Sequence, residues 1–364
     1  MKLTLLGGGG FRVPLMFRTL LRDESDQRVT ELRLWDTDAE RLAVIRSILG
    51  AMASGHPKAP VVRVAGDLDD AVAGADFVFS AIRAGGTEGR ATEETIAHCC
   101  GVLGQETTGF GGLDYALRGI PTAVHIAEQI ARLAPGAHLI NFTNPAGIIT
   151  EVSAQILGDR VIGICDSPVG LARRALSTLE GAGLVPAGTA SQVIAGDDRV
   201  RLDYLGLNHL GWLQRLLVDG EDVLPRLLER PGLISSFEEG RLFGADWIRH
   251  LGSVPNEYLH YYYFARETRR ADEAVEATRG VFLAAQQRDF YARAATLPGP
   301  EAYALWEATR LRREETYMAS NRLAAGGVER DAADLASGGY DRVALAVMKA
   351  IAFDETTDLI VNLR

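Results

Sequence analysis

The first half of the chain alternates short apolar runs with longer amphipathic stretches. Leu3–Leu6 and Glu31–Trp35 are runs of the kind that form buried strands, and Pro14–Leu21 between them has helical spacing. This alternation predicts βαβ units, and therefore an α/β fold with a Rossmann-like, doubly wound parallel sheet. We expect further strands at Val61–Val64, Phe77–Ile82, Leu139–Phe142 and Val161–Ile164, and a helix at Thr122–Leu133.

The pattern changes after about residue 200. Leu202–Leu207 and Trp212–Val218 alternate like strands of a separate antiparallel sheet, and helical periodicity dominates from Phe237 onward. We therefore predict a nucleotide-binding domain over residues 1–200 and an α+β catalytic and oligomerisation domain over residues 201–364. The second domain is expected to contain long helices at Val275–Ala294, Leu305–Asn321 and Tyr340–Ile351, and a closing strand at Asp358–Asn362.

Composition narrows the class of protein. The 364 residues are 47% hydrophobic, which suffices for two folded domains, and the formal net charge is -10. This acidic balance argues against binding to nucleic acid or to an acidic membrane surface, so an anionic ligand must be met by locally placed cations. The chain shows no targeting segment and no apolar run long enough to span a membrane. Its three cysteines suit a reducing compartment, so we expect a cytoplasmic protein.

A run of glycines follows the first predicted strand and precedes the first predicted helix. A backbone without Cβ atoms can approach a pyrophosphate there and direct it to the helix N-terminus. Gly7 and Gly9 match the first half of the G-x-G-x-x-G fingerprint, but Arg12 stands where the third glycine belongs. Asp36 follows the second strand, where a carboxylate binds a ribose diol and repels a 2′-phosphate, so NAD⁺ is favoured over NADP⁺. The alternative is a tight turn with a capping aspartate.

Polar side chains follow two later strands and interrupt an apolar segment of the second half. Asn144 follows one predicted strand, and Cys165 and Asp166 follow the next. Ligands of open parallel sheets bind at this edge, so these side chains are candidates for a site. Cys165 and His209 could together hold a divalent ion that substrate oxygens and water complete. The alternatives are an Asx-type turn at Asn144, a buried thiol at Cys165 and a hydrogen-bonded core histidine at His209.

Several motifs occur in one order along the chain: the glycine run Gly7–Gly10, then Gly104–Gly109, Asn141–Pro145, Ile164–Asp166, Asn208–Trp212 and Pro255–Tyr262. Their order and spacing resemble glycoside hydrolase family 4, and most closely its 6-phospho-β-glucosidases. The resemblance implies tightly bound NAD⁺ and a divalent ion such as Mn²⁺ as cofactors. It also implies a phosphorylated glycoside as substrate and a homodimer or homotetramer as the assembly.

The resemblance further implies an unusual reaction. Such enzymes depart from the two-carboxylate scheme of most glycosidases. The sugar is oxidised at C3 at the expense of NAD⁺, a base removes the C2 proton, and the aglycone leaves from C1 by elimination. Water then adds to the unsaturated ketone, and the hydride returns to C3, so that NAD⁺ is restored. A 6-phospho-β-glucoside would yield glucose 6-phosphate and the free aglycone.

By the same resemblance, Cys165 and His209 would be the metal ligands, Asp166 the acid for the leaving group and Tyr258 the base at C2. Glu106 would assist Tyr258, whose pKa of about 10 must fall beside a cation before the phenol can act as a base. The sugar or its phosphate would be bound by Arg90, Asn144 and Arg279. The nucleotide would be bound by Gly7, Gly8, Gly9, Gly10, Phe11, Arg12, Asp36 and Asn144.

Two roles have competing candidates. Tyr261 is the alternative to Tyr258 as the base, and Arg83 is the rival of Arg90 for an anion. Without the resemblance, the tyrosines of this run would be expected to pack, because they recur at helical spacing.

The function also keeps alternatives. Asp166 stands where β-acting members of the family are expected to carry asparagine, so a 6-phospho-α-glycosidase stays open. An NAD-dependent sugar or 2-hydroxyacid dehydrogenase and a non-catalytic NAD-binding protein are the other candidates. Cys99 and Cys100 are expected to pack within a helix. Related chains are expected to continue beyond a closing strand such as Ile360–Arg364.

Overall fold

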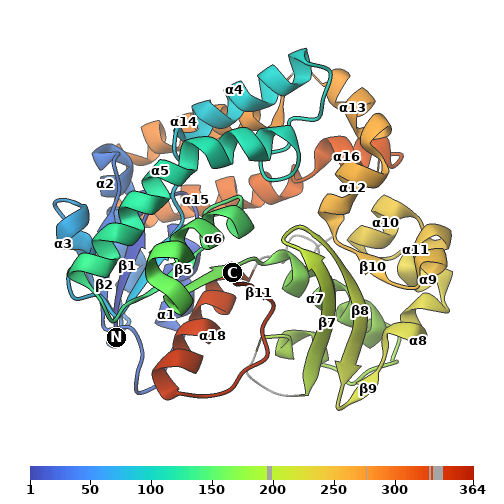
Figure 1. The fold of residues 1–364 in the computed structure, drawn as a ribbon, viewed down its shortest axis with the longest axis horizontal. Coiled ribbons are helices and arrows are strands. Elements are labelled where there is room, and N and C mark those ends of the chain that lie inside the picture. Colours follow the sequence, from blue (N-terminus) through green and yellow to red (C-terminus); the bar gives the residue numbers. More distant parts are fainter. Residues whose placement is uncertain (195–198, 276, 328, 331–338) are drawn as a thin grey trace.

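The computed structural model describes residues 1–194, 199–275, 277–327, 329–330 and 339–364. These residues form a seven-stranded sheet in the order β11-β6-β5-β4-β1-β2-β3 and a smaller sheet in the order β10-β8-β7, with β9 beside β8. The larger sheet is parallel except for β11, which pairs antiparallel with β6. In Figure 1, helices cover this larger sheet, and the smaller antiparallel sheet lies at the lower right. The predicted α/β fold class is therefore confirmed.

The strands agree closely with the apolar runs of the sequence. Strand β4 is buried at every position, as expected for a central parallel strand covered on both faces. The strands are β1 (Lys2–Leu6), β2 (Glu31–Trp35), β3 (Val61–Val64), β4 (Phe77–Ser80), β5 (His138–Asn141), β6 (Val161–Ile164), β7 (Val200–Leu207), β8 (Leu210–Val218), β9 (Glu221–Asp222), β10 (Val254–Pro255) and β11 (Val361–Asn362).

The helices of the first half connect the parallel strands, and those of the second half dominate the chain after β9. The helices are α1 (Val13–Leu21), α2 (Ala39–Ala53), α3 (Leu68–Val72), α4 (Gly86–Cys99), α5 (Phe110–Leu133), α6 (Ala146–Leu157), α7 (Ser167–Gly181), α8 (Leu224–Leu228), α9 (Pro231–Ile234), α10 (Glu238–Phe243), α11 (Ala245–Leu251), α12 (His260–Tyr263), α13 (Ala265–Glu273), α14 (Arg279–Ala294), α15 (Gly299–Glu315), α16 (Ala319–Ala324) and α18 (Tyr340–Phe353).

Three helix predictions were wrong at their ends. Helix α5 starts at Phe110 and runs through Pro121, although a proline inside a helix lacks the N–H that the helix would use. The helix expected over Leu305–Asn321 is divided into α15 and α16, because Met318 takes a left-handed φ of 51°. Helix α14 begins only at Arg279, where the Thr278 hydroxyl caps it by accepting from the N–H of Val281.

The prediction for two cysteines was also wrong. Cys99 and Cys100 are exposed at the C-terminal end of α4, so they do not pack within the helix layer. Helical periodicity directs Arg90, Glu94 and Ala97 inward instead.

Side chains from the second half of the chain fix the position of the glycine-rich loop of the first half. Three buried aromatic side chains from α14, α15 and α18 donate hydrogen bonds to consecutive or neighbouring carbonyls of this loop. The bonds run from Tyr291 Oη to the Gly9 carbonyl (2.6 Å), from Trp306 Nε1 to the Phe11 carbonyl (2.7 Å) and from Tyr340 Oη to the Arg12 carbonyl (2.5 Å). The loop is therefore positioned by residues that lie almost a whole chain length away.

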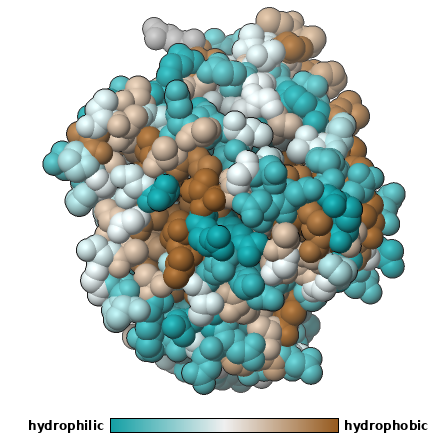
Figure 2. Space-filling view, turned by 90° about the vertical axis from the view of Figure 1, so that its left-hand side faces the viewer, coloured by the Kyte–Doolittle hydropathy of each residue, from teal (hydrophilic) through white to brown (hydrophobic). Residues whose placement is uncertain are grey.

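The surface is mixed in polarity. Figure 2 shows the left-hand side of the molecule, where hydrophilic residues surround a band of hydrophobic ones. At the open end of the larger sheet, β3 leaves Val61 and Val64 exposed. In the described part of the chain, no helix combines the length and apolar character needed to cross a membrane.

We predict that Tyr291→Phe lowers the free energy of unfolding by about 1–3 kcal/mol, because it leaves the buried Gly9 carbonyl without its donor. Urea unfolding followed by tryptophan fluorescence measures the change. Tyr303→Phe is the matched control, since the Tyr303 hydroxyl only accepts from the partly exposed Arg18, which keeps its ion pair with Glu307. Equal stability of the wild type and Tyr291→Phe would contradict the anchoring role.

Candidate active site

A cavity of about 1450 Å³ lies at the C-terminal edge of the parallel sheet. It exceeds the ~300–1,000 Å³ of common ligand pockets, so it has room for a dinucleotide and a second ligand. All the predicted site residues line this cavity except Gly8. Gly8 instead packs against β2, where a Cβ atom would lie 2.9 Å from both Leu34 Cβ and the Trp35 nitrogen.

The glycine-rich loop is built by backbone contacts that exclude side chains. Gly7 has φ 83°, and a Cβ there would lie 2.7 Å from the Ala81 carbonyl oxygen. The N–H of Gly9 donates to Asp36 Oδ2 at 2.8 Å, so the predicted ribose-binding carboxylate also orients the loop. Phe11 is buried, and its ring packs against that of Phe290 with 5.1 Å between centroids, so its side chain is part of the hydrophobic core.

A thiol and a carboxyl group follow β6 at the same edge. Burial and the adjacent Asp166 raise the pKa of the Cys165 thiol to about 12. Burial also raises the pKa of Asp166 although the Arg12 charge opposes this, and the nearby Glu314 adds to the rise. Asp166 occupies the N-cap position of α7, yet its side chain makes no capping hydrogen bond. Its carboxyl group therefore stays available to the cavity.

His209 occupies the tight turn between β7 and β8. Its φ of 64° is unusual for a residue with a side chain, and such strained positions cluster at functional sites. His209 Nδ1 lies 3.0 Å from Thr107 Oγ1, which leaves Nε2 as the ring nitrogen for a ligand. Burial lowers the pKa of His209 to about 4, so the imidazole is neutral at physiological pH and can coordinate a metal.

The loop that carries Thr107 is itself rigid. Gln105 Oε1 accepts from the backbone N–H groups of Thr107 and Thr108, each at 2.6 Å. A Cβ at Gly104 would lie 2.7 Å from Glu94 Cα, so only glycine fits against α4. This packing fixes the positions of Glu106 and Thr107 opposite His209.

Glu106 forms ion pairs with both of the arginines that are candidates for binding an anion. Its Oε2 pairs with Arg83, and its Oε1 lies 2.8 Å from Arg90 Nη1. Burial would raise the pKa of Glu106, but the charges of Arg83, Arg90 and Arg313 outweigh it and hold the pKa well below its usual range. Arg83 Nη1 is buried and has no hydrogen-bond partner among the described residues, so this group can still bind an anion.

A group of arginines around the cavity repel one another. Burial and the charges of Arg12, Arg279 and Arg90 lower the pKa of Arg313 to about 9. Burial and the Arg90 charge lower the pKa of Arg279 to about 10, although Arg279 donates to the Thr316 hydroxyl at 2.5 Å and the Arg313 carbonyl at 2.9 Å. Burial and mutual repulsion make this group of arginines electrostatically unfavourable, so their convergence points to an anionic ligand. Sequence reasoning gave Arg313 no role, since one arginine in an arginine-rich helix carries no distinguishing signal.

Tyr258 lies against the candidate metal ligand. Its ring stacks on that of His209 with 4.1 Å between centroids and 14° between planes. Burial raises its pKa well above 10, and the carboxylates of Glu106 and Glu257 raise it further. Tyr261 also lines the cavity, with its centroid 6.2 Å from that of Tyr258. The geometry thus gives Tyr258, and not Tyr261, the contact with His209.

Glu257 is a further buried group that sequence reasoning missed. Its Oε1 accepts from the Ser167 hydroxyl at 3.1 Å, which links it to the segment after Cys165. Burial raises the pKa of Glu257 to about 8, against the opposing charge of Arg174 and with support from Glu239. Its position beside Tyr258 in sequence was visible, but its burial and its neighbours depend on the fold.

The two asparagines of Asn141–Pro145 have different surroundings. Asn141 is fully buried, and its side-chain amide donates to the Thr143 carbonyl of the same turn at 3.2 Å and to the Thr150 hydroxyl on α6 at 3.1 Å. Of the two, Asn144 lines the cavity.

No group of three or more His, Cys, Asp or Glu side chains suited to a metal occurs in residues 1–194, 199–275, 277–327, 329–330 and 339–364. A metal at Cys165 and His209 would thus take further ligands from substrate or water.

Comparison with known proteins identifies one family over both halves of the chain. The model of the family 4 glycosyl hydrolases matches residues 2–180, and the model of that family's C-terminal domain matches residues 204–364. Over 288 residues the chain is 30% identical to a probable 6-phospho-beta-glucosidase of Bacillus subtilis, covering 77% of this chain and 62% of the relative. Over 279 residues it is 30% identical to a 6-phospho-alpha-glucosidase of Leptotrichia buccalis, covering 72% and 60%. The chain thus spans about three fifths of the length of these relatives.

A solved structure shares the fold. The 6-phospho-beta glucosidase from Thermotoga maritima, solved with manganese, NAD⁺ and glucose-6-phosphate, aligns with a TM-score of 0.69 and 26% identity. The alignment covers 86% of this chain and 72% of that chain.

We predict that Arg313→Gln raises the free energy of unfolding of the unliganded protein by on the order of 1 kcal/mol, because it removes a partly buried cation that its neighbours repel. The same change should weaken binding of inorganic phosphate by roughly tenfold, through loss of a charge-assisted hydrogen bond. Thermal unfolding with and without phosphate measures both effects. Arg312→Gln, at an exposed position of the same helix, is the control. A less stable variant with undiminished phosphate binding would show that the arginines do not form an anion site.

Proposed function

We propose, from the premise that this chain belongs to the family 4 glycosyl hydrolases, that it hydrolyses 6-phosphoglycosides with NAD⁺ and a divalent ion such as Mn²⁺. We favour 6-phospho-β-glucosides as substrates, with glucose 6-phosphate and the aglycone as products. The β preference rests on the sequence motifs, because relatives named for either anomer reach 30% identity.

The observation that carries this proposal is the convergence of arginines in one cavity of an acidic protein. Arg12, Arg90, Arg279 and Arg313 line the cavity together with the glycine-rich loop, although the chain has a net charge of -10. A phosphate dianion is a natural ligand for guanidinium groups, which bind it through paired hydrogen bonds. A solved relative holds glucose-6-phosphate, which supports this assignment.

The residues present fit both cofactors. Gly7, Gly9 and Gly10 form a cradle without side chains at the start of α1, and Asp36 stands beside it, as dinucleotide binding requires. The thiol of Cys165 and the free Nε2 of neutral His209 are suitable donors for a divalent ion. When bound, NAD⁺ accepts and returns a hydride, and the divalent ion stabilises negative charge on sugar oxygens.

The protein's own groups supply proton transfer. Tyr258 is the proposed base at C2, and a cation at His209 would favour its phenolate because the two rings are stacked. Asp166 is the proposed acid for the leaving group, and its raised pKa suits a group that must hold a proton. Glu106 holds Arg83 and Arg90, so its proposed assistance to Tyr258 includes placing those cations.

The proposal extends to the whole protein. Residues 1–200 would bind the nucleotide, and residues 201–364 would supply the metal-binding histidine and the catalytic tyrosine. A thiolate ligand at Cys165 requires a reducing environment, which supports a cytoplasmic location. We also propose that the assembly is a homo-oligomer.

We expect release of nitrophenol from p-nitrophenyl 6-phospho-β-glucoside only when both NAD⁺ and Mn²⁺ are present, without net formation of NADH. The substrate without phosphate should react at least ~10²-fold more slowly, because it loses charge-assisted contacts to the arginines. Absorbance at the nitrophenolate and NADH wavelengths measures both products. NADH accumulation without nitrophenol would instead indicate a dehydrogenase, and faster turnover of the α anomer would reverse the anomer assignment.

We expect Cys165→Ser to weaken Mn²⁺ binding by at least roughly tenfold, since it replaces the proposed thiolate ligand by a hydroxyl group. Titration calorimetry with Mn²⁺ and the Mn²⁺ concentration for half-maximal activity measure the effect. The double variant Cys99→Ser/Cys100→Ser is the matched control, because both thiols are exposed and outside the cavity lining. Equal Mn²⁺ affinity of Cys165→Ser and this control would remove Cys165 from the metal site.

A further inference from the structure

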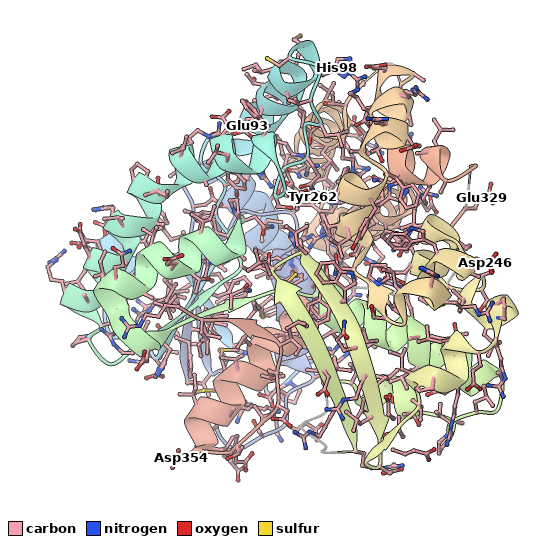
Figure 3. The ribbon with its side chains drawn as sticks, turned by 45° about the vertical axis from the view of Figure 1, so that its right-hand side comes forward. Glu93, His98, Asp246, Tyr262, Glu329 and Asp354 are labelled. Atoms are coloured by element: carbon pink, nitrogen blue, oxygen red, sulfur yellow. The ribbon has the colours of Figure 1, made fainter. Side chains whose placement is uncertain are left out.

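The proposed acid and the proposed base lie on elements from different halves of the chain. Asp166 occupies the N-cap position of α7, directly after strand β6 of the larger sheet. Tyr258 lies in a 3-10 turn over Glu257–Leu259, which follows strand β10 of the smaller sheet. In Figure 3, Tyr262 marks the helix that follows this turn, near the ends of β7 and β8. No strand pairing joins the two sheets in the described part of the chain, so side-chain contacts must fix the separation of acid and base.

Glu257 forms such a contact. This residue directly precedes Tyr258, and Ser167 directly follows Asp166. The Ser167 hydroxyl donates to Glu257 Oε1 at 3.1 Å. Both side chains are buried, so water does not compete for this hydrogen bond. One hydrogen bond thus joins the segment that carries the proposed base to the segment that carries the proposed acid.

Tyr317, between α15 and α16, adds a second contact to the same carboxyl oxygen. Its hydroxyl donates to Glu257 Oε1 at 3.5 Å, and the side chains of Tyr317 and Tyr258 are also hydrogen-bonded to each other. A hydroxyl group donates one hydrogen bond and accepts up to two, so both contacts can exist together. Glu257 therefore reaches Tyr258 in two ways, along the backbone and through the Tyr317 hydroxyl.

The other oxygen of Glu257 lies at the margin of a buried network of ion pairs. In this network Arg174 pairs with Glu239, and Arg330 Nε lies 3.0 Å from Glu238 Oε1. Glu257 Oε2 lies 3.8 Å from Arg174 Nη2 and has no hydrogen-bond partner among the described residues. The two guanidinium groups are thus engaged by other carboxylates, and Glu257 has no close counter-ion of its own.

These surroundings favour the neutral form of Glu257. Burial raises the pKa of Glu257 to about 8, although the Arg174 charge opposes this rise and Glu239 adds to it. A neutral carboxyl group keeps an acceptor oxygen, which is all that the hydroxyl groups of Ser167 and Tyr317 require. A glutamine side chain has the same shape and offers the same acceptor.

We propose that Glu257 is a positioning residue that holds Tyr258 and Asp166 at a fixed separation through its hydrogen bonds with Ser167 and Tyr317. This role needs the acceptor oxygen of Glu257 and not a negative charge. The inference rests on the proposed function, in which the base acts at C2 and the acid at the group leaving the neighbouring C1. A misplacement of such groups on the order of 1 Å can cost roughly 10²-fold in rate, even where substrate binding is unchanged.

We expect Glu257→Leu to lower kcat by at least about tenfold and to change KM by less than about threefold, because it displaces catalytic groups and not substrate ligands. Glu257→Gln should keep kcat within about threefold of the wild type, because its amide oxygen replaces the acceptor. Nitrophenol release from the 6-phosphoglucoside anomer that the wild type hydrolyses, at saturating NAD⁺ and Mn²⁺, measures both constants. Circular dichroism verifies the fold of each variant.

A double-variant cycle tests the hydrogen bond between Glu257 and Ser167. Ser167→Ala should lower kcat by about fivefold, and adding it to Glu257→Leu should cause no further loss, because both changes remove the same contact. The matched control is Ser153→Ala, since the buried Ser153 hydroxyl has no hydrogen-bond partner among the described residues. If Glu257→Leu does not fold, Ser167→Ala and Tyr317→Phe carry the test, and unchanged kcat in both would overturn the proposal.

The remaining outcomes separate this inference from the proposed function. An equal loss of kcat in Glu257→Gln and Glu257→Leu, effects of Ser167→Ala and Glu257→Leu that multiply, or a change confined to KM would each overturn the positioning role alone. Absence of nitrophenol release by the wild type would overturn the proposed function and this inference with it. Losses that do not multiply, together with retained kcat in Glu257→Gln, would support the positioning role.

Discussion

The structure depends on how the carbonyl groups of the glycine-rich loop are satisfied. This loop must approach the sheet so closely that its carbonyls are buried, and a buried carbonyl without a donor costs about 1–3 kcal/mol. Side chains that could donate locally are excluded, because glycine is what allows the close approach. The donors are Tyr291, Trp306 and Tyr340, which come from the other half of the chain. The second half is therefore a structural part of the proposed dinucleotide site, although β11 is the only strand that its described residues contribute to the larger sheet.

The same packing forces the arginines together. Helices α14 and α15, which carry Tyr291 and Trp306, also carry Arg279 and Arg313 into the cavity. Burying several cations is unfavourable without counter-charges, and Glu106 offsets the charges of Arg83 and Arg90. The charged forms of Arg313 and Arg279 are less stabilised than those of Arg83 and Arg90, as the lowered pKa values of Arg313 and Arg279 indicate. The protein thus keeps an unfavourable arrangement in its unliganded state that an anionic ligand would relieve, which is a common compromise between stability and function.

The sequence was sufficient for features that depend on local pattern. Short apolar runs predicted β2, β3 and β6 at their observed bounds, and the edge of the parallel sheet brought Asp36, Asn144 and Cys165 to one cavity. The sequence was insufficient for features that depend on contacts between residues far apart along the chain. Pro121 is accommodated within α5, and Met318 separates α15 from α16; neither outcome could be predicted from the residue type. The roles of Tyr291 and Arg313 depend on partners hundreds of positions away, so no local spacing could have revealed them.

The electrostatics of Tyr258 connect the two halves of the cavity. Burial and nearby carboxylates hold this phenol in its neutral form, and His209 beside it is neutral too. Neither residue can therefore provide the positive charge that a phenolate needs. Of the arginines whose charges act on Tyr258, Arg90 is already paired with Glu106 and Glu94, and Arg12 interacts most strongly with the Asp166 carboxylate. A base at this position becomes competent only when a further cation enters the site. If Tyr258 is the base, as proposed, proton abstraction would be conditional on an assembled site, which would protect a bound sugar from premature deprotonation.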